Sequence, residues 1–413
     1  MKVFSLPRLL AYGLFGFPLA LLALPIYVYV PQFYAERFGM SLSLIGSALL
    51  VSRVLDAFLD PLLGAWIDKR PANQGYGRFI LYSLPLLIPG FYALFHPPAA
   101  TAVSPMLWFF CALLMVYAGY SLASIAFQSW GAALTQFPGE RLRLTATREL
   151  CGVAGVVTAA LLSQFADISW LSAVLICSLL ICAFLLLRFT PDLLNRHLEQ
   201  HTSLRWRELF LNPYFRSLFL VFVLNGIAAA IPATLFLFFA KDRLQLASYS
   251  GVLLLLYFVA AAMSLPLWVR IAHRIHETRA WLLAMLLSVL SFIWAYSLQA
   301  GDLTAFAVIC VLSGLCLGAD LALPPALLSG VIRQAGHSER YEGSYFGAWN
   351  WASKMNLALA AGLSLPLLDY MGYTPGISTG GGLHALSFAY AVLPCVLKCL
   401  AALVLWRAPL RKV

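Results

Sequence analysis

The amino-acid sequence predicts an all-α integral membrane protein with twelve transmembrane helices, arranged as two six-helix bundles. Of its 413 residues, 62% are hydrophobic and only 11% are charged, whereas soluble proteins average about 25% charged residues. Apolar stretches recur along the whole chain, and most are long enough to cross a bilayer, which takes about 20 residues. Only short polar segments separate them, so few residues remain for a soluble domain.

The expected membrane spans follow these apolar stretches in order. The first stretch is longer than the apolar core of a signal peptide and lacks a clear cleavage site, so we interpret it as a retained span. The spans are expected at residues 9–34, 42–67, 79–95, 105–134, 149–166, 170–189, 214–240, 248–270, 280–299, 304–333, 343–369 and 384–407.

The longest connection on the expected inner side separates the first six spans from the last six. Many membrane proteins with repeated architecture divide into two halves in this way. The sequence therefore predicts an N-terminal bundle at 1–189, which contains a cation site, a cytoplasmic linker at 190–213 and a C-terminal bundle at 214–413.

The formal net charge of +10 comes from Lys and Arg residues that gather on one side of the expected membrane. Lys69, Arg141 and Arg411 illustrate their positions in the inner connections and the C-terminal tail. Because cytoplasmic loops carry an excess of Lys and Arg, this asymmetry places both termini in the cytoplasm. We expect a monomeric multi-pass protein of the cell (inner) membrane, with a small-molecule substrate and no nucleic-acid partner.

The stretch 42–67 carries three charges, Arg53, Asp56 and Asp60. Their spacing of three and four residues places them on one helical face. Each charge at the centre of a span costs roughly 2.5–3.5 kcal/mol on insertion scales, so such residues are usually functional. The three sum to −1, and Lys354 in the stretch 343–369 is the best candidate to balance them. The alternative is a static salt-bridge cluster that joins the two spans.

Two further charges lie in the later spans. Asp320 precedes Pro324 and Pro325, so it is either a functional acid or a hydrogen-bonded residue at a helix break. Lys398 is a weaker candidate than Lys354 for the counter-charge. It lies nine residues before Arg407, so the alternative is that its long side chain extends toward the inner interface.

Polar and aromatic residues in the stretches 105–134 and 343–369 are candidates for a ligand cavity. Aromatic rings with amide and hydroxyl groups suit a polar organic ligand that also has apolar faces. Hydrogen bonds between helices are the alternative explanation. The predicted substrate-binding residues in these stretches are Tyr120, Ser124, Gln128, Trp349 and Asn350, and Ser121 is assigned to the cation site.

Several motifs are absent from the sequence. It contains no Gly-rich phosphate loop with its Lys, no metal-ligand spacing of His and Cys, and no nucleophile elbow. We therefore expect no cofactor and no enzymatic activity. The eight cysteines all lie in apolar stretches and are interpreted as small core residues.

Three motifs together resemble the glycoside–pentoside–hexuronide:cation symporter family of the major facilitator superfamily. The first is Arg53-x-x-Asp56-Ala57-x-x-Asp60-Pro61-x-x-Gly64. The second runs from Gly139-Glu140-Arg141 to Arg148, and the third from Glu342-Gly343 through Phe346-Gly347 to Lys354. The similarity to melibiose-permease-like members covers nearly the whole chain and implies the major facilitator fold.

The resemblance implies a cation site on Asp56 and Asp60, with Lys354 nearby, and a sugar cavity between the two halves. It also places Tyr120, Ser121 and Arg148 where the family has site residues. Several positions depart from the family pattern. Acids that bind galactoside hydroxyls are replaced by Ala20 and Ser124, and an Asn that helps to bind sodium is replaced by Leu59. The family also has a Trp near the position of Gln128.

These features predict a cation-coupled symporter that moves a small organic solute, most plausibly a sugar or glycoside, by alternating access. The coupling ion is H⁺ or Na⁺. Leu59 favours H⁺, because sodium needs several oxygen ligands; Asp56 and Asp60 are metal ligands only if the ion is Na⁺. Ala20 and Ser124 argue against a galactoside. A lysolipid or other amphipathic solute is the alternative, and a non-transport membrane enzyme is less well supported.

Overall fold

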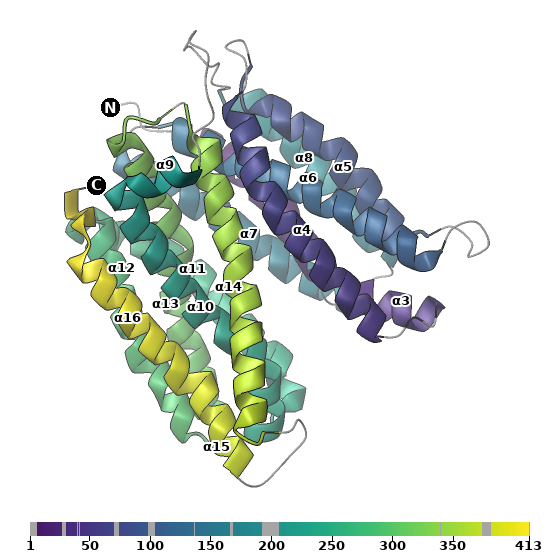
Figure 1. The fold of residues 1–413 in the computed structure, drawn as a ribbon, viewed down its shortest axis with the longest axis vertical. Coiled ribbons are helices and arrows are strands. Elements are labelled where there is room, and N and C mark those ends of the chain that lie inside the picture. Colours follow the sequence, from purple (N-terminus) through teal and green to yellow (C-terminus); the bar gives the residue numbers. More distant parts are fainter. Residues whose placement is uncertain are drawn as a thin grey trace. The chain divides into compact units, whose positions relative to one another are not determined.

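The computed structural model describes residues 6–26, 30–38, 40, 42–69, 74–97, 104–135, 137–165, 168–191, 206–338, 340–373 and 381–412. Within these ranges the regular structure is helical throughout (Figure 1). Eight of the described helices are long and apolar enough to cross a membrane. Most of the predicted linker at 190–213 lies outside the described residues, so its boundaries stay a prediction.

The chain forms two compact units. Unit 1 comprises Met1–Glu208 and Ile332–Trp351, and unit 2 comprises Leu209–Val331 and Ala352–Val413. The division thus differs from a simple cut of the chain into halves, because one segment from the second half belongs to unit 1.

Unit 1 contains the helices of the first half of the sequence. The predicted first span consists of separate helices, because the chain turns at Leu14 and Phe15. The helices are α1 (Leu6–Gly13), α2 (Gly16–Leu24), α3 (Val30–Phe38), α4 (Leu42–Asp68), α5 (Gly77–Phe95), α6 (Pro105–Ala133), α7 (Pro138–Phe165) and α8 (Ile168–Phe189), and the short α9 (Trp206–Leu211) follows at the boundary with unit 2.

Small residues allow the helices of unit 1 to approach closely. α5 and α4 pack against α6, and α2 packs against α7. A Cβ atom at Gly155 of α7 would lie 2.2 Å from the carbonyl oxygen of Phe17 in α2. Helix contacts in membranes favour small residues for this reason, because the backbones themselves come into contact.

Unit 2 contains most of the remaining helices, and they coincide with the predicted spans. They are α10 (Pro213–Phe238) with the π-helical turn Phe239–Arg243, α11 (Ser250–Ile275), α12 (Glu277–Phe292), most of α13 (Leu303–Gln334), the second part of α14 (Glu342–Tyr370), α15 (Gly381–Ser387) and α16 (Leu393–Arg407).

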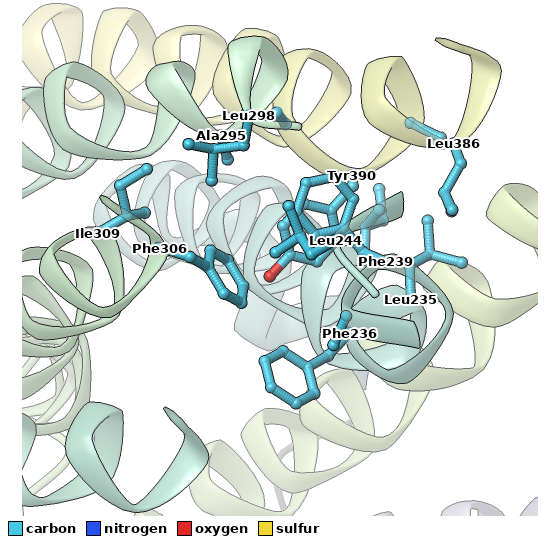
Figure 2. Packing of buried hydrophobic residues seen from close by; sticks show 14 of the residues in the cluster. Leu235, Phe236, Phe239, Leu244, Ala295, Leu298, Phe306, Ile309, Leu386 and Tyr390 are labelled. Carbon is cyan, nitrogen blue, oxygen red and sulfur yellow. The ribbon is translucent and has the colours of Figure 1, made fainter. Parts of the chain in front are cut away.

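Aromatic side chains fill part of the core of unit 2 (Figure 2). The rings of Phe239 and Tyr390 stack with their centroids 4.0 Å apart. Phe306 packs against both rings, and Phe236 lies beside Phe306. Such close packing fixes the position of Tyr390.

The first turn of α14 is anchored to the end of α4 within unit 1. Asp68 accepts hydrogen bonds from the backbone N–H groups of Gly343 and Ser344, each at 2.7 Å. These N–H groups lie at a helix N-terminus, which lacks internal partners and favours a negative charge. A Cβ at Gly64 would lie 2.2 Å from the Gly343 carbonyl oxygen, so the two backbones touch. The contact positions the next turns of α14, which carry two predicted site residues.

Candidate cation and substrate site

The charged face of α4 is buried as the sequence predicts. Asp56 is 2% exposed and Asp60 is 0% exposed, and Arg53 lies partly buried one turn before Asp56. Apolar residues of the same helix, such as Phe58 and Leu62, point outward and are exposed. The helix therefore separates a polar inner face from an apolar outer face, as its spacing requires.

α6 supplies the polar groups that face these acids. The Ser121 hydroxyl donates a hydrogen bond of 2.7 Å to Oδ1 of Asp56. Tyr117 and Tyr120 lie close enough to Arg53 and Asp56 to interact with their charges. The predicted members Asp56, Ser121 and Tyr120 are thus brought together, whereas Tyr117 was not predicted.

A second polar network lies further along α6. The Gln128 side-chain amide donates to the Ser124 hydroxyl at 2.8 Å and to the Asn350 side-chain oxygen at 3.2 Å. Trp349, beside Asn350, is 3% exposed. The anchoring of α14 by Asp68 brings Asn350 to this position, so residues separated by more than 200 positions form one site. Amide and hydroxyl groups of this kind can donate to and accept from the hydroxyls of a sugar.

Arg148 of α7 pairs with its neighbour Glu149. The two guanidinium bonds to the Glu149 carboxylate measure 3.0 Å and 2.5 Å. The Tyr12 hydroxyl of α1 lies near the Arg148 guanidinium, and it donates to the Phe127 carbonyl at 3.1 Å. Tyr120 interacts with the charges of both Glu149 and Asp56. Glu149 therefore belongs to the surroundings of the predicted site, as does Tyr12.

Lys354 lies on α14 beyond the point where the chain passes into unit 2. Its predicted pairing with Asp56 and Asp60 stays a prediction.

Asp320 occupies a separate polar site in unit 2. Its carboxylate accepts from Lys398 at 2.7 Å, from the indole N–H of Trp281 at 2.8 Å and from the Asn225 amide at 3.1 Å. Lys398 is 9% exposed. The alternative in which Lys398 extends to the inner interface is therefore wrong, because its ammonium group pairs with the Asp320 carboxylate inside unit 2.

Several participants could not be assigned from their own sequence surroundings. Tyr12, Tyr117 and Trp281 are aromatic residues in apolar stretches, where aromatic residues are common. Asn225 is the one with a usable signal, because it is an amide in the middle of the apolar stretch 214–240. Within the described ranges no group of three or more His, Cys, Asp or Glu residues is arranged to hold a metal ion.

Comparison with known proteins identifies the family. A family model described as MFS/sugar transport protein matches residues 10–412. The chain belongs to this family of transporters. The family predicted from the three motifs is thereby confirmed, and the family is one of membrane transporters rather than enzymes.

Individual relatives are more distant. The isoprimeverose transporter of Lactiplantibacillus pentosus is 29% identical over 31% of this chain and 27% of its own length. A glucuronide carrier protein homolog of Escherichia coli K12 is 22% identical over 93% of this chain and 88% of its own length. The match to the first relative thus spans little more than a quarter of that protein.

A solved structure supports the predicted fold. A bacterial homologue of the iron transporter ferroportin superposes with a TM-score of 0.75 and 15% identity, covering 98% of this chain and 99% of that one. The fold class of an all-α, multi-pass membrane protein with major facilitator architecture is confirmed.

Proposed function

We propose that this chain is a cation-coupled symporter that moves a sugar or glycoside by alternating access between its two units, with H⁺ as the coupling ion. The observation that carries the proposal is the pair of buried acids on adjacent turns of α4, with the Ser121 hydroxyl donating to Asp56. Buried acids within a membrane span are expensive, and transporters use them as ion or proton sites.

We base the choice of H⁺ on the residue that lies between the two acids. Sodium needs several oxygen ligands, whereas a proton needs one carboxylate. Leu59 lies between the acids and supplies no oxygen. The cation would bind Asp56 or Asp60 in exchange for Lys354, which stays the proposed counter-charge. This exchange would couple the charge of the site to the arrangement of the two units.

The solute would bind at the polar groups of α6, α7 and α14. Gln128, Ser124 and Asn350 form a connected set of amides and a hydroxyl, and Trp349 adds an aromatic face beside them. Tyr120 and the Arg148–Glu149 pair lie in the same unit. Such a mixture fits a ring with several hydroxyl groups better than a long acyl chain, so a sugar is favoured over a lysolipid.

The positive charge of the inner connections supports an inner-membrane protein with both termini in the cytoplasm. Attaching a fluorescent protein that matures only in the cytoplasm to the C-terminus tests this orientation. Fluorescence of the fusion is expected, and a dark but correctly inserted fusion would contradict it.

Transport is tested with purified protein in liposomes. A thermal-shift screen against sugars, glycosides, uronates and lysolipids first identifies a ligand, because binding stabilises the folded state by mass action. Uptake of that ligand is then measured under a pH gradient without sodium, and under a sodium gradient without a pH difference. Accumulation driven by the pH gradient supports the proposal. Accumulation driven by sodium alone would assign the site to Na⁺, and equilibration without accumulation would refute symport.

A further inference from the structure

Unit 2 contains a cavity that the proposed transport site does not use. Its volume is about 380 Å³, within the range of small-molecule pockets. The wall is formed by α10, α11, α12, α13 and the region around α16, and most of it is apolar or aromatic. The ion pair between Asp320 and Lys398 provides its charged part. A mostly apolar pocket with a few converging polar groups is the usual form of a ligand site.

The wall of the cavity is well ordered by packing. Tyr390 and Phe236 line it, and both belong to the aromatic cluster in which Tyr390 stacks on Phe239 (Figure 2). Elsewhere on the wall, the thiol of Cys395 contacts the Val289 carbonyl at 3.9 Å. The space is therefore already shaped before a ligand enters.

At the polar end of the cavity there are more hydrogen-bond donors on Lys398 than acceptors among the described residues. The Asp320 carboxylate accepts from three donors, Lys398, Trp281 and Asn225. A carboxylate offers about four acceptor positions, whereas an ammonium group has three N–H donors. Among the residues that the structure describes, Lys398 gives one of these donors to Asp320 and the other two have no acceptor. An oxygen atom in the cavity could accept from them.

Charge balance limits what that oxygen can belong to. Asp320 and Lys398 together are neutral, so a neutral ligand leaves the site neutral. An anion would add an uncompensated negative charge to an apolar cavity, which is strongly unfavourable. A cation would have to compete with the three groups that already donate hydrogen bonds to the Asp320 carboxylate.

The cavity is accessible along α10. Ala229, Ala233 and Leu237 line it at intervals of four residues, and all three are exposed. Small side chains at the first two positions leave an opening. The cavity therefore reaches the surface of unit 2 along this helix.

We propose that this cavity is a binding site for a small neutral organic molecule with an apolar body and one hydroxyl or carbonyl oxygen. The apolar body contacts the aromatic and aliphatic wall, and the oxygen accepts a hydrogen bond from Lys398. The site shares no residue with the proposed cation and sugar site in unit 1.

Binding of radiolabelled 1-naphthol tests the proposal, because this probe is neutral, apolar and has one hydroxyl group. Full-length protein in lipid nanodiscs is compared with empty nanodiscs, which correct for partition into lipid. Saturable binding is expected, and Ala233→Phe should weaken it at least about tenfold by filling the opening. Leu220→Phe is the matched control, since Leu220 is an exposed residue of the same helix that does not line the cavity. Absent saturable binding, or equal binding by both variants, would overturn the proposal.

A second comparison isolates the polar contact. Naphthalene has the same body without oxygen and should compete about tenfold more weakly than 1-naphthol, because a hydrogen bond to a charged donor is lost. In the double variant Asp320→Asn/Lys398→Met this preference should disappear while naphthalene still binds. An unchanged preference would show that the ion pair only stabilises the unit.

The charge of the ligand is tested with 1-naphthoate at neutral pH. The neutral-ligand proposal predicts that this anion competes more weakly than 1-naphthol. Stronger competition by the anion would overturn the proposed chemistry and assign the cavity to organic acids.

Discussion

Two buried charge clusters, one in each unit, differ in how their charges are balanced. In unit 1, Arg53, Asp56 and Asp60 lie on one helix and sum to −1. In unit 2, Asp320 and Lys398 lie on different helices, contact each other at 2.7 Å and sum to zero. The charges on α4 need a counter-charge from outside their helix, for which we propose Lys354, whereas Asp320 and Lys398 already form a neutral pair.

The surroundings of the two clusters also differ, because those in unit 1 are polar and those in unit 2 are mostly apolar. The acids of α4 face hydroxyl groups of α6, and the amides of Gln128 and Asn350 continue the polar surface in that unit. Asp320 and Lys398 instead face an apolar cavity. Unit 1 therefore suits a cation and a polar solute, and unit 2 suits a neutral apolar molecule. The following predictions test that contrast.

The largest expected effect is on coupling. Asp56→Asn should abolish accumulation driven by a pH gradient but allow exchange of substrate between the two sides. A gradient of one pH unit can drive about tenfold accumulation, since one unit corresponds to 1.36 kcal/mol, and this tenfold should be lost. Uptake into liposomes measures it.

Two controls accompany Asp56→Asn. Asp302→Asn removes an exposed carboxylate that bonds the backbone of Gln299, and it should leave accumulation unchanged. The neutral double variant Asp320→Asn/Lys398→Met should also accumulate substrate. If the double variant loses coupling while Asp56→Asn keeps it, the roles of the two clusters are reversed.

The second prediction concerns stability in unit 2. Lys398→Met leaves Asp320 without its counter-charge, and removing one partner of a buried pair costs about 3–5 kcal/mol. Adding Asp320→Asn should restore much of the loss, because the double variant buries no charge. Thermal unfolding in nanodiscs measures both. Arg407→Met at the exposed end of α16 should change little, and a Lys398→Met protein as stable as that control would show that the pair contributes nothing.

The contrast between the clusters could be predicted only in part from the sequence. Arg53, Asp56 and Asp60 share a face because helical periodicity fixes the directions of residues three and four positions apart. Apolar stretches of sufficient length likewise indicate the spans and, with the motifs, the fold. These features depend on residues that are close in sequence.

Pairing between helices could not be predicted in the same way. Lys398 lies near a basic chain end, so its position suggested the membrane interface, but α13 brings Asp320 within reach. Asn350 reaches Gln128 because Asp68 anchors α14 to α4, and the tight contact of Gly64 with Gly343 permits this. Such contacts depend on which helices are neighbours, and one sequence does not contain that information.

The third prediction compares a glycine from each unit. Gly64→Ala would place a Cβ against the Gly343 carbonyl, so α14 must move, at a cost of about 1–3 kcal/mol. Gly251→Ala in α11 meets no atom within 4 Å, and it should stabilise by up to about 1 kcal/mol through helix propensity. The two melting temperatures should therefore shift in opposite directions. If Gly64→Ala leaves the melting temperature unchanged, the contact between α4 and α14 can adapt to the added methyl group without loss of stability.

The fourth prediction separates the polar network of unit 1 from the polar site of unit 2. Gln128→Leu removes the donor to Ser124 and Asn350 and should raise the KM for the transported solute about fivefold, corresponding to one hydrogen bond of about 1 kcal/mol. Asn225→Leu removes a donor to Asp320 and should leave that KM unchanged. Gln299→Leu, on an exposed segment, controls for the substitution itself. A larger KM effect from Asn225→Leu would place solute binding in unit 2.

The smallest expected effect is a difference in pH dependence between groups outside the spans. His337 in unit 1 lies 2.9 Å from the Tyr345 hydroxyl, and burial together with the charge of Arg340 lowers its pKa. The folded protein therefore prefers neutral His337. This contribution to stability is complete above the unfolded pKa of about 6.5 and decreases as pH falls below it. Tyr373 in unit 2, which donates to Asp242, has a pKa raised by burial and by that bond, so it stays neutral throughout this range.

Melting temperatures between pH 5.5 and 7.5 test this difference. The gap between wild type and His337→Gln should narrow as pH falls, because protonation removes the advantage of the native histidine. The gap between wild type and Tyr373→Phe should stay constant. We expect the change in stability with pH at His337 to be the smallest of the five predicted effects, since solvent screens the charge of a half-buried group. If the difference in melting temperature between wild type and His337→Gln does not change with pH, His337 has the same pKa in the folded and unfolded chains. Its surroundings would then not distinguish unit 1 from unit 2.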